Sequence, residues 1–338
     1  MTRLERQAHP SICVYGAGAV GGHIAGRLAA GGSQVSLIAR GAQLDAIQNQ
    51  GLRVETREGL LVSRPYATDR PDSLKPQDIV VVTVKAPALP AIAGGIASLL
   101  HSGSLVLFVG NGIPWWYFYA HGGAHDGTRL TRLDPGDALW TRVGPQRVAG
   151  AVAYTAGSVV APGVIRAENA RNRLVVGRPD GLADDRLDTV ASLLTPTGLE
   201  VSTTTRIRDA IWAKLSMNLI GGSLGVLSDS PMKDVLDKPA IASAAEAMAA
   251  ECAAVARALG CDPGDPVEGL AKLATSGHLQ SVVQDLRAGR PMEIDALFTV
   301  PLDLAELAQV PTPTLNMIIG LATQRARAAG LYKDTERH

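Results

Sequence analysis

The run Gly16-Ala17-Gly18-Ala19-Val20-Gly21 constrains the fold of this chain more than any other segment. It directly follows the apolar residues 12–15 and precedes an alanine-rich stretch, roughly residues 23–30, so the order is that of a strand, a tight turn and a helix. In the spacing G-x-G-x-x-G the first glycine makes the turn, the second admits a pyrophosphate against bare backbone, and the third lets the helix pack closely on the strand. The pattern predicts a dinucleotide site with the diphosphate at the helix N-terminus. A glycine-rich turn without a ligand is the alternative.

The residue after the next predicted strand, residues 34–38, bears on which dinucleotide is bound. A chain that selects NAD usually places Asp or Glu there to bind the ribose hydroxyls, whereas this chain has Arg40. A guanidinium matches a 2′-phosphate through two hydrogen bonds, so Arg40 favours NADP over NAD. The alternative is a solvated arginine at a strand end.

The composition favours a globular protein of two domains. The chain has 338 residues, of which 46% are apolar and 19% charged, and its 32 basic residues balance its 32 acidic ones. No net charge therefore draws it to nucleic acid or to an anionic membrane. Cys13, Cys252 and Cys261 lack metal-ligand spacing, so we expect buried free thiols, no metal site and a reducing compartment. Without an apolar leader or an uncharged stretch of membrane-spanning length, we expect a cytoplasmic protein.

The pattern of apolar residues changes near residue 205. Before it, short apolar strands alternate with helical segments, which is typical of a doubly wound α/β sheet; the strands are expected at 78–84, 104–109, 148–154, 173–177 and 199–201. After it, helices are expected at 206–219, 239–259, 266–274, 279–288, 295–309 and 312–329. We therefore predict a Rossmann-type domain over residues 1–205 and an all-helical domain over residues 206–338. The alanine-rich residues 240–260 would suit a subunit interface, so we consider a homodimer.

Two predicted strands end in polar residues. Lys85 follows residues 78–84 and Asn111 follows residues 105–110. Ligands of open α/β sheets lie at the carboxyl ends of strands, so Lys85 could reach a cofactor phosphate or ribose, and Asn111 could bind the nicotinamide side or a substrate. Ordinary strand-end polarity is the alternative.

Lys214 and Asn218 lie four residues apart and hence on one face of a predicted helix. A carbonyl that accepts a hydride develops negative charge on its oxygen, which a cationic lysine can stabilise and protonate. Asn218 could orient the same substrate. A surface lysine whose stem covers apolar neighbours is the alternative.

A second polar group lies between residues 278 and 295. Ser281 and Asp285 share a helical face, and Gly289 can end that helix, so that Glu293 enters the start of the next one. A carboxylate there could hold an active-site lysine. The alternative is a glutamate that the helix dipole favours.

Taken together in this order, these motifs resemble the ketopantoate reductase family from about residue 11 to residue 332. The resemblance implies an NADP-dependent reductase of a 2-oxo acid in pantothenate synthesis, with its active site in a cleft between the domains. It implies Lys214 as general acid with Glu293 as its partner carboxylate, while Asn111, Asn218 and Ser281 position cofactor and substrate, and Asp285 lies near the site. Arg40 and Lys85 match positions associated with the NADPH phosphate and ribose, and Glu293 also approaches the cofactor.

Two departures from the family leave the substrate open. After Asn218 the family typically has a second asparagine, but here Gly221-Gly222-Ser223 occupies that stretch, so a substrate hydroxyl could lack a partner. The aromatic run 115–119 could line a pocket for a bulkier acid, or it could be a packed loop or a subunit contact. The candidates are thus a ketopantoate reductase, a paralogue acting on another 2-oxo acid, and a non-catalytic NADP-binding sensor.

Overall fold

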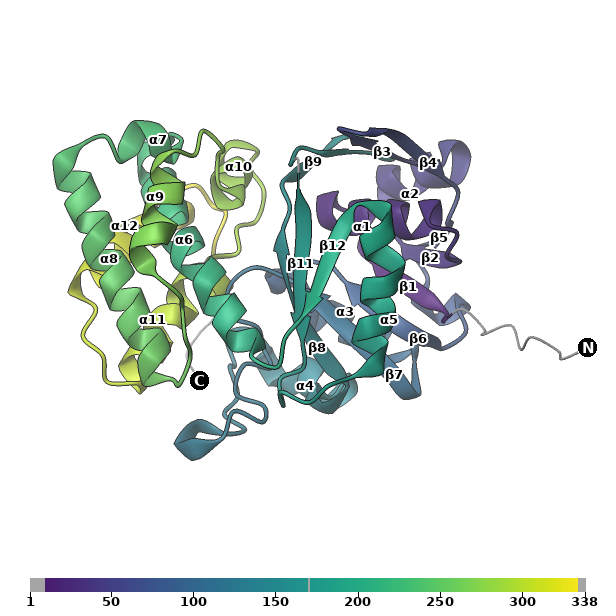
Figure 1. Ribbon diagram of the computed structural model, residues 1–338, viewed down its shortest axis with the longest axis horizontal. Helices are drawn as coiled ribbons and strands as arrows, with labels where there is room; N and C mark the ends of the chain where they lie inside the picture. The colour runs from purple at the N-terminus through teal and green to yellow at the C-terminus, as the bar shows by residue number, and fades with distance from the viewer. Residues whose placement is uncertain (1–9, 170, 334–338) are drawn as a thin grey trace, which may run out of the picture. The chain divides into compact units, whose positions relative to one another are not determined.

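The computed structural model describes residues 10–169 and 171–333, and the chain divides into two compact units (Figure 1). The first unit consists of Met1–Val84, Ala91–Gly110 and Ala138–Thr205, and the second of Lys85–Pro90, Asn111–Asp137 and Arg206–His338. Two loops within the range 1–205 therefore group with the helical unit. Both loops begin with a residue that the sequence analysis singles out, Lys85 and Asn111.

The first unit is built on an eight-stranded sheet with the order β12-β11-β8-β7-β6-β1-β2-β5. All neighbours pair in parallel except β8 and β11, which are antiparallel. The strand order reverses between β1 and β6, which is where doubly wound sheets bind ligands. The strands are β1 (Ile12–Tyr15), β2 (Val35–Ile38), β5 (Tyr66–Thr68), β6 (Gln77–Val82), β7 (Leu100–Val109), β8 (Val148–Tyr154), β11 (Asn172–Gly177) and β12 (Leu199–Thr203).

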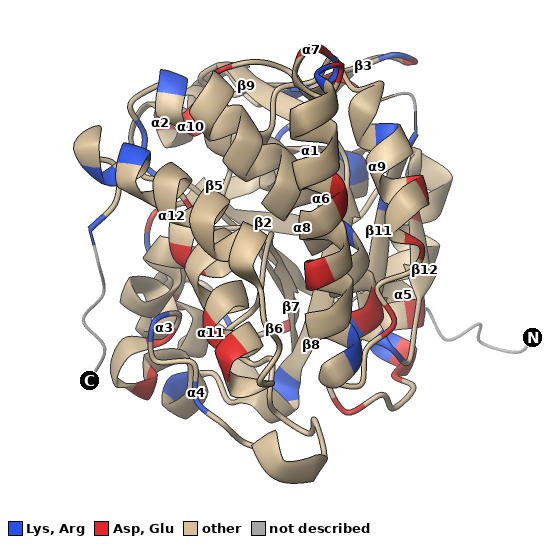
Figure 2. Ribbon diagram, turned by 90° about the vertical axis from the view of Figure 1, so that its left-hand side faces the viewer, with Lys and Arg blue, Asp and Glu red and all other residues tan. Residues whose placement is uncertain are grey.

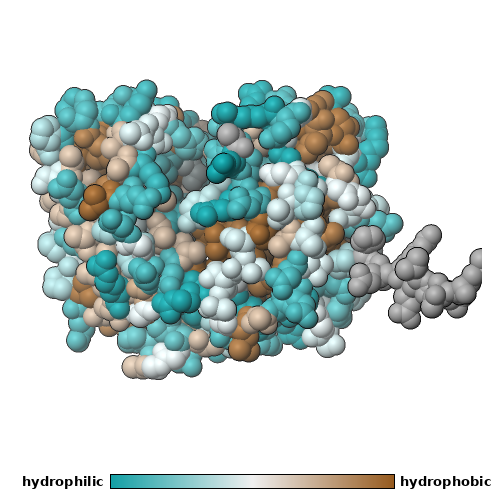
Figure 3. Space-filling view, viewed as in Figure 1, coloured by the Kyte–Doolittle hydropathy of each residue, from teal (hydrophilic) through white to brown (hydrophobic). Residues whose placement is uncertain are grey.

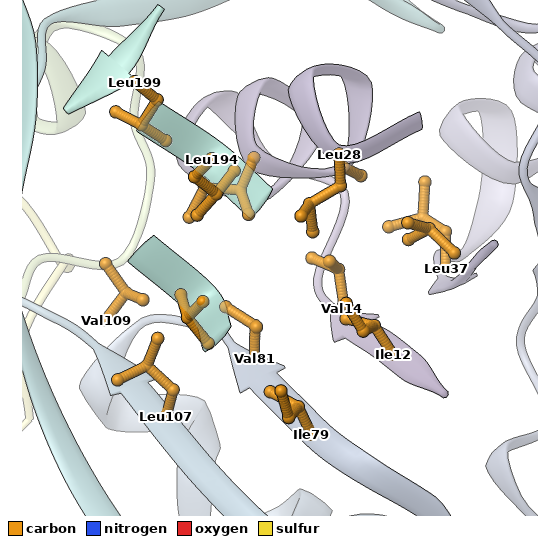
Figure 4. Packing of buried hydrophobic residues seen from close by; sticks show 14 of the residues in the cluster. Ile12, Val14, Leu28, Leu37, Ile79, Val81, Leu107, Val109, Leu194 and Leu199 are labelled. Atoms are coloured by element: carbon orange, nitrogen blue, oxygen red, sulfur yellow. The ribbon is translucent and has the colours of Figure 1, made fainter. Parts of the chain in front are cut away.

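The core of this unit lies between the sheet and its helices (Figure 4). Alternate strand residues such as Val14 and Val81 meet Leu28 of α1 (Ala19–Ala30) and Leu194 of α5 (Asp185–Leu194). The alternation follows from the two-residue period of a strand, which sends one set of side chains to each face. The unit also contains α2 (Gly41–Gln50), α3 (Leu89–Ala97), which begins in the Lys85–Pro90 segment, and α4 (Ala138–Arg142). The doubly wound fold predicted from the sequence is confirmed.

A second, four-stranded sheet of this unit was not predicted. Its order is β4-β3-β10-β9, formed by β3 (Leu52–Thr56), β4 (Gly59–Ser63), β9 (Gly157–Ala161) and β10 (Val164–Ala167). The sheet packs on α1 at two glycines, where an added Cβ would lie 2.6 Å from Ile165 (at Gly22) and 2.5 Å from Val54 (at Gly26). The glycines of α1 therefore serve sheet packing as well as the cofactor turn.

The second unit is helical, and Figure 2 shows α6, α8 and α12 with few charged residues. Its helices are α6 (Ile207–Ser228), α7 (Met232–Val235), α8 (Pro239–Ala258), α9 (Pro266–Ala274), α10 (Ser281–Arg287), α11 (Val300–Leu307) and α12 (Pro313–Ala328). The predicted helix at 295–309 starts as a π-helix, Asp295–Thr299, before α11. By length and hydropathy alone α6 and α8 could cross a membrane; 61% of the apolar window of α6 and 39% of that of α8 are buried within the protein.

The aromatic run 115–119 is a packed loop of this unit. Trp115, Trp116, Tyr117 and Phe118 are each at most 2% exposed. The Trp212 indole donates a buried hydrogen bond of 2.8 Å to the Tyr117 hydroxyl. These four rings are therefore core, and the prediction that they line a pocket for a bulkier acid is not supported.

Candidate active site

The glycine turn after β1 has the geometry of an anion site. Gly16 has φ +111°, and a Cβ on Gly21 would lie 1.9 Å from the Gly16 carbonyl oxygen, so neither position accepts a side chain. A Cβ on Gly18 would meet nothing within 4 Å, which leaves the backbone open to a ligand. Gly18 is also the N-cap of α1, which has no side-chain cap and no acidic residue in its first turn. The positive end of this helix is thus free for a diphosphate.

Arg40 lies at the carboxyl end of β2 and is the N-cap of α2. Its side chain is exposed, and among residues 10–169 and 171–333 no carboxylate forms an ion pair with it. A guanidinium without an internal partner is available to an anionic ligand. This position of Arg40 is the one that the sequence analysis assigned to a 2′-phosphate.

In the second unit, Lys214 of α6 is held by the loop that carries Asn111. The Lys214 ammonium donates a hydrogen bond of 2.7 Å to the Asn111 side-chain oxygen. Protein atoms crowd the partly exposed Lys214 side chain, and the resulting desolvation lowers its pKa to about 8. A lysine with that pKa can give up its proton near neutral pH, as a general acid must.

The Asn111 loop is fixed by the π-helix that follows Glu293. In this helix the Val300 N–H donates to the Asp295 carbonyl, so the next donor in the series would come from Pro301, which has no N–H. The Ala296 carbonyl instead accepts a bond of 2.8 Å from the Ile113 N–H. Gly112, which lies between Asn111 and Ile113, has φ +79°, and a Cβ there would lie 2.2 Å from the Ala296 oxygen. The sequence Asn-Gly thus allows Asn111 to be placed beside Lys214.

Glu293 is buried and accepts a hydrogen bond of 3.1 Å from the Ala86 N–H. Burial raises the pKa of Glu293, while the Ala86 N–H and the cations Lys85 and Lys214 oppose that rise. In turn the charge of Glu293 raises the pKa of Lys214 against the effect of burial. Glu293 and Lys214 are therefore electrostatically linked.

Asp285 of α10 is also buried, and it pairs with two cations. Its carboxylate accepts hydrogen bonds from the Lys85 ammonium and, at 2.9 Å, from the Arg290 guanidinium. The side chain of Asp285 is 3% exposed, so two positive partners compensate its desolvation. Sequence reasoning did not identify Arg290 as a site residue. The sequence feature that could have identified Arg290 is its five-residue spacing from Asp285 across the Gly289 turn, which brings the Arg290 N–H to the Asp285 carbonyl.

Asn218 and Ser281 lie on two helices that pack together. Asn218 is on α6, one turn after Lys214 and one turn before Gly222, and Ser281 begins α10 with an exposed side chain. A Cβ on Gly222 would lie 3.1 Å from Val282 and 3.3 Å from Phe298. The helix face that carries Lys214 and Asn218 thus ends at Gly222 against apolar side chains. Lys85, Asn111, Lys214, Asn218, Ser281, Asp285 and Glu293 all belong to the second unit.

Comparison with known proteins decides the family. Profiles described as "Ketopantoate reductase PanE/ApbA" and "Ketopantoate reductase PanE/ApbA C terminal" match residues 12–181 and 206–326. The chain belongs to the ketopantoate reductase family. It is 38% identical to the 2-dehydropantoate 2-reductase of Mesorhizobium japonicum, over 95% of this chain and 99% of that protein. A ketopantoate reductase homologue of known structure from Ralstonia solanacearum MolK2 is 35% identical, with a TM-score of 0.89 over 96% of this chain and 100% of that one.

Family membership makes the protein an oxidoreductase of the pyridine-nucleotide-dependent type. Its fold is shared more widely, because a D-mandelate dehydrogenase solved with NADH and anilino(oxo)acetate is 19% identical with a TM-score of 0.80, over 95% of this chain and 100% of that one. At that identity the likeness concerns the fold alone. The resemblance seen in the sequence is thus confirmed for the family and the fold.

Proposed function

We propose that this protein reduces 2-dehydropantoate to pantoate with NADPH, in the pantothenate pathway of the cytoplasm. The observation that carries the proposal is the Lys214 ammonium, held at 2.7 Å by Asn111 and with its pKa lowered to about 8. The naming of the Mesorhizobium japonicum relative as a 2-dehydropantoate 2-reductase supports the choice of substrate.

The residues of the second unit have separate tasks in this proposal. Lys214 donates a proton to the substrate carbonyl oxygen as negative charge develops there. Asn111 accepts from the same ammonium without neutralising its charge, so it orients the proton donor. Glu293 keeps Lys214 protonated by its negative charge.

Substrate binding falls to the neighbouring residues. Ser281 has an exposed hydroxyl at the start of α10 for the substrate carboxylate, and Asn218 presents an amide on the Lys214 face of α6. Lys85, fixed by Asp285, keeps a side chain that is 46% exposed and can donate to a ribose or phosphate oxygen.

The glycine turn and Arg40 fit an NADP dinucleotide. The open backbone at Gly18 and the uncapped start of α1 would hold the diphosphate, and Arg40 would bind the 2′-phosphate. When bound, NADPH supplies the hydride for the 2-oxo carbon.

A second candidate function is the reduction of a different 2-oxo acid. The observation in its favour is the closed apolar end of the α6 face, where Val282 and Phe298 approach Gly222. No side chain at Gly222 can donate to a substrate hydroxyl, so a 2-oxo acid without a hydroxyl would lose nothing there.

The test follows NADPH oxidation by its absorbance, with 2-dehydropantoate and a panel of 2-oxo acids, and uses Lys214→Met as the control. Turnover of 2-dehydropantoate that exceeds the other acids and depends on Lys214 is expected. Faster turnover of an acid without the hydroxyl would favour the second candidate. Tight NADPH binding with no turnover of any acid would contradict both and favour a sensor.

A further inference from the structure

Strand β4 is an unprotected edge of the small sheet. Among the strands within residues 10–169 and 171–333, β4 pairs on one side only, with β3, in the order β4-β3-β10-β9. Its outward residues Leu60 and Val62 are 56% and 57% exposed, and Figure 3 shows an apolar cluster over the small sheet that Figure 1 labels β3 and β4. Natural edge strands are usually interrupted by charge or proline, but Gly59–Ser63 contains neither.

The register of the β3–β4 hairpin determines which backbone groups face the free edge. Thr56 pairs with Gly59 across a two-residue loop, so Gly59, Leu61 and Ser63 direct their N–H and C=O groups to β3. Leu60 and Val62 therefore direct theirs outward. A strand that pairs antiparallel with this edge must therefore have residues whose backbone N–H and C=O groups point toward β4.

A second β4 satisfies that condition by two-fold symmetry. When the axis passes through Leu61, Leu60 lies opposite Val62 of the second copy, and each residue can exchange both backbone hydrogen bonds with its counterpart. The side chains of Leu60 and Val62 from both copies then lie on the same face of the joined sheet. A two-fold interface needs this self-complementarity.

The charges that flank β4 select the same register. Glu58 lies three residues before Leu61 and Arg64 three residues after it, so each Glu58 lies opposite Arg64 of the second copy. Arg64 is exposed and forms no ion pair with any residue in the described ranges 10–169 and 171–333. Glu58 contacts Arg27 at 3.3 Å but remains 63% exposed. Shifting the register by one pair on either side would place Glu58 or Arg64 opposite an apolar residue.

We propose that two copies of this protein pair antiparallel through β4 about a two-fold axis at Leu61, which joins their small sheets into one eight-stranded sheet. The opposite edge strand, β9, exposes Val159 and Val160 but carries no complementary charges at its ends. The alanine-rich α8, the interface considered in the sequence analysis, is not used in this pairing.

The first test measures the dimer dissociation constant by sedimentation velocity on the full chain. Arg64→Glu places two like charges opposite each other at each end, and it is expected to weaken the dimer about tenfold or more. Adding Glu58→Arg restores opposite charges and is expected to restore the dimer. Val62→Lys should also abolish pairing, whereas the matched change Val160→Lys on β9 should not. A wild-type monomer at micromolar concentration, or a dimer indifferent to these β4 changes, would overturn the proposal.

A second test does not depend on affinity. Leu61 is the residue of β4 that lies opposite itself, and in a non-hydrogen-bonded antiparallel pair the two Cα atoms are about 4.5 Å apart, within disulfide range. Leu61→Cys should therefore give a covalent dimer under mild oxidation. Ser63→Cys, which lies opposite Gly59 of the second copy, should not, and Cys13, Cys252 and Cys261 are buried. Equal cross-linking of the two variants would count against the register.

Discussion

The ammonium of Lys214 donates to the amide oxygen of Asn111 across 103 residues of sequence. The bond joins α6 to the loop after β7, and both belong to the helical unit. Because an amide is neutral, it fixes the direction of the ammonium without forming an ion pair that would hold the proton. An asparagine partner therefore suits a lysine that acts as a proton donor better than a lysine with a purely structural role.

Replacing Asn111 by Ala should therefore lower kcat strongly while the free energy of unfolding changes little. Without its acceptor the lysine adopts several rotamers, and loss of an oriented donor typically costs about 10- to 100-fold in rate. Steady-state kinetics and thermal unfolding of the same preparation check this. Unchanged kcat in Asn111→Ala would remove the asparagine from the proposed chemistry.

The rate of reduction should fall as pH rises through about 8. Reduction requires protonated Lys214, and burial lowers the pKa of that lysine from 10.5 to about 8. The descending limb of kcat/KM against pH reports this pKa in the free enzyme. A limb near 10.5 would contradict the assignment.

Changing Glu293 to Gln should move that limb to lower pH. The negative charge of Glu293 raises the pKa of Lys214, so its loss leaves the burial effect unopposed. The residual activity of Lys214→Met provides the control, since it should show no limb of this kind. An unshifted limb in Glu293→Gln would show that the two side chains act independently.

Gly112 should tolerate no side chain. An alanine there would have φ near +79° and a Cβ 2.2 Å from the Ala296 carbonyl oxygen, so the Ile113–Ala296 hydrogen bond would have to break. We expect a loss of roughly 2 kcal/mol or more in the free energy of unfolding. The matched control is Gly127→Ala, which has φ +74° but open space around the Cβ and should lose only about 1 kcal/mol. Similar losses by chemical denaturation would show that backbone conformation alone governs Gly112.

The sequence was informative where the signal was local. The glycine spacing, the doubly wound alternation and the i, i+4 pair of Lys214 and Asn218 each depend on residues close together in the chain, and the strand β8 was predicted at its observed bounds. The small sheet was missed because 107 residues lie between the end of β3 and the start of β10, which pair only in the folded chain.

The site required long-range information for the same reason. Asp285 was expected near the substrate, but its partners Lys85 and Arg290 could not be inferred from helical spacing. The π-helix at the start of the predicted helix 295–309 has a local cause, since Pro301 lacks an N–H donor. The Ala296 carbonyl that it frees accepts a hydrogen bond from the distant Ile113, which helical spacing could not predict. The role of the aromatic run 115–119 was ambiguous because its burial depends on the distant helix α6, whose Arg208 donates to the Tyr117 and Tyr119 carbonyls.

Lys85 and Asp285 should behave as one unit in a double-mutant cycle. Lys85→Met or Asp285→Asn alone should each lower kcat/KM about tenfold, because the first change removes the Lys85 ammonium and the second releases it from its fixed position. The double variant should be no worse than the poorer single variant. Additive losses would mean that the two side chains contact the ligands separately and that their ion pair has no part in positioning.

Arg40 should control the choice between NADPH and NADH. Arg40→Ala removes a guanidinium that has no carboxylate partner among the described residues 10–169 and 171–333, so the fold should lose little stability. A charge-assisted bond to a phosphate contributes about 1.5–3 kcal/mol, so the KM for NADPH should rise by roughly 10- to 100-fold while that for NADH changes little. Arg70→Ala is the matched control, because Arg70 is an exposed arginine of the same unit that pairs only loosely with Asp72 at 3.8 Å. If Arg40→Ala and wild type show the same ratio of KM values for the two cofactors, a group other than Arg40 reads the 2′-phosphate or the enzyme uses NAD.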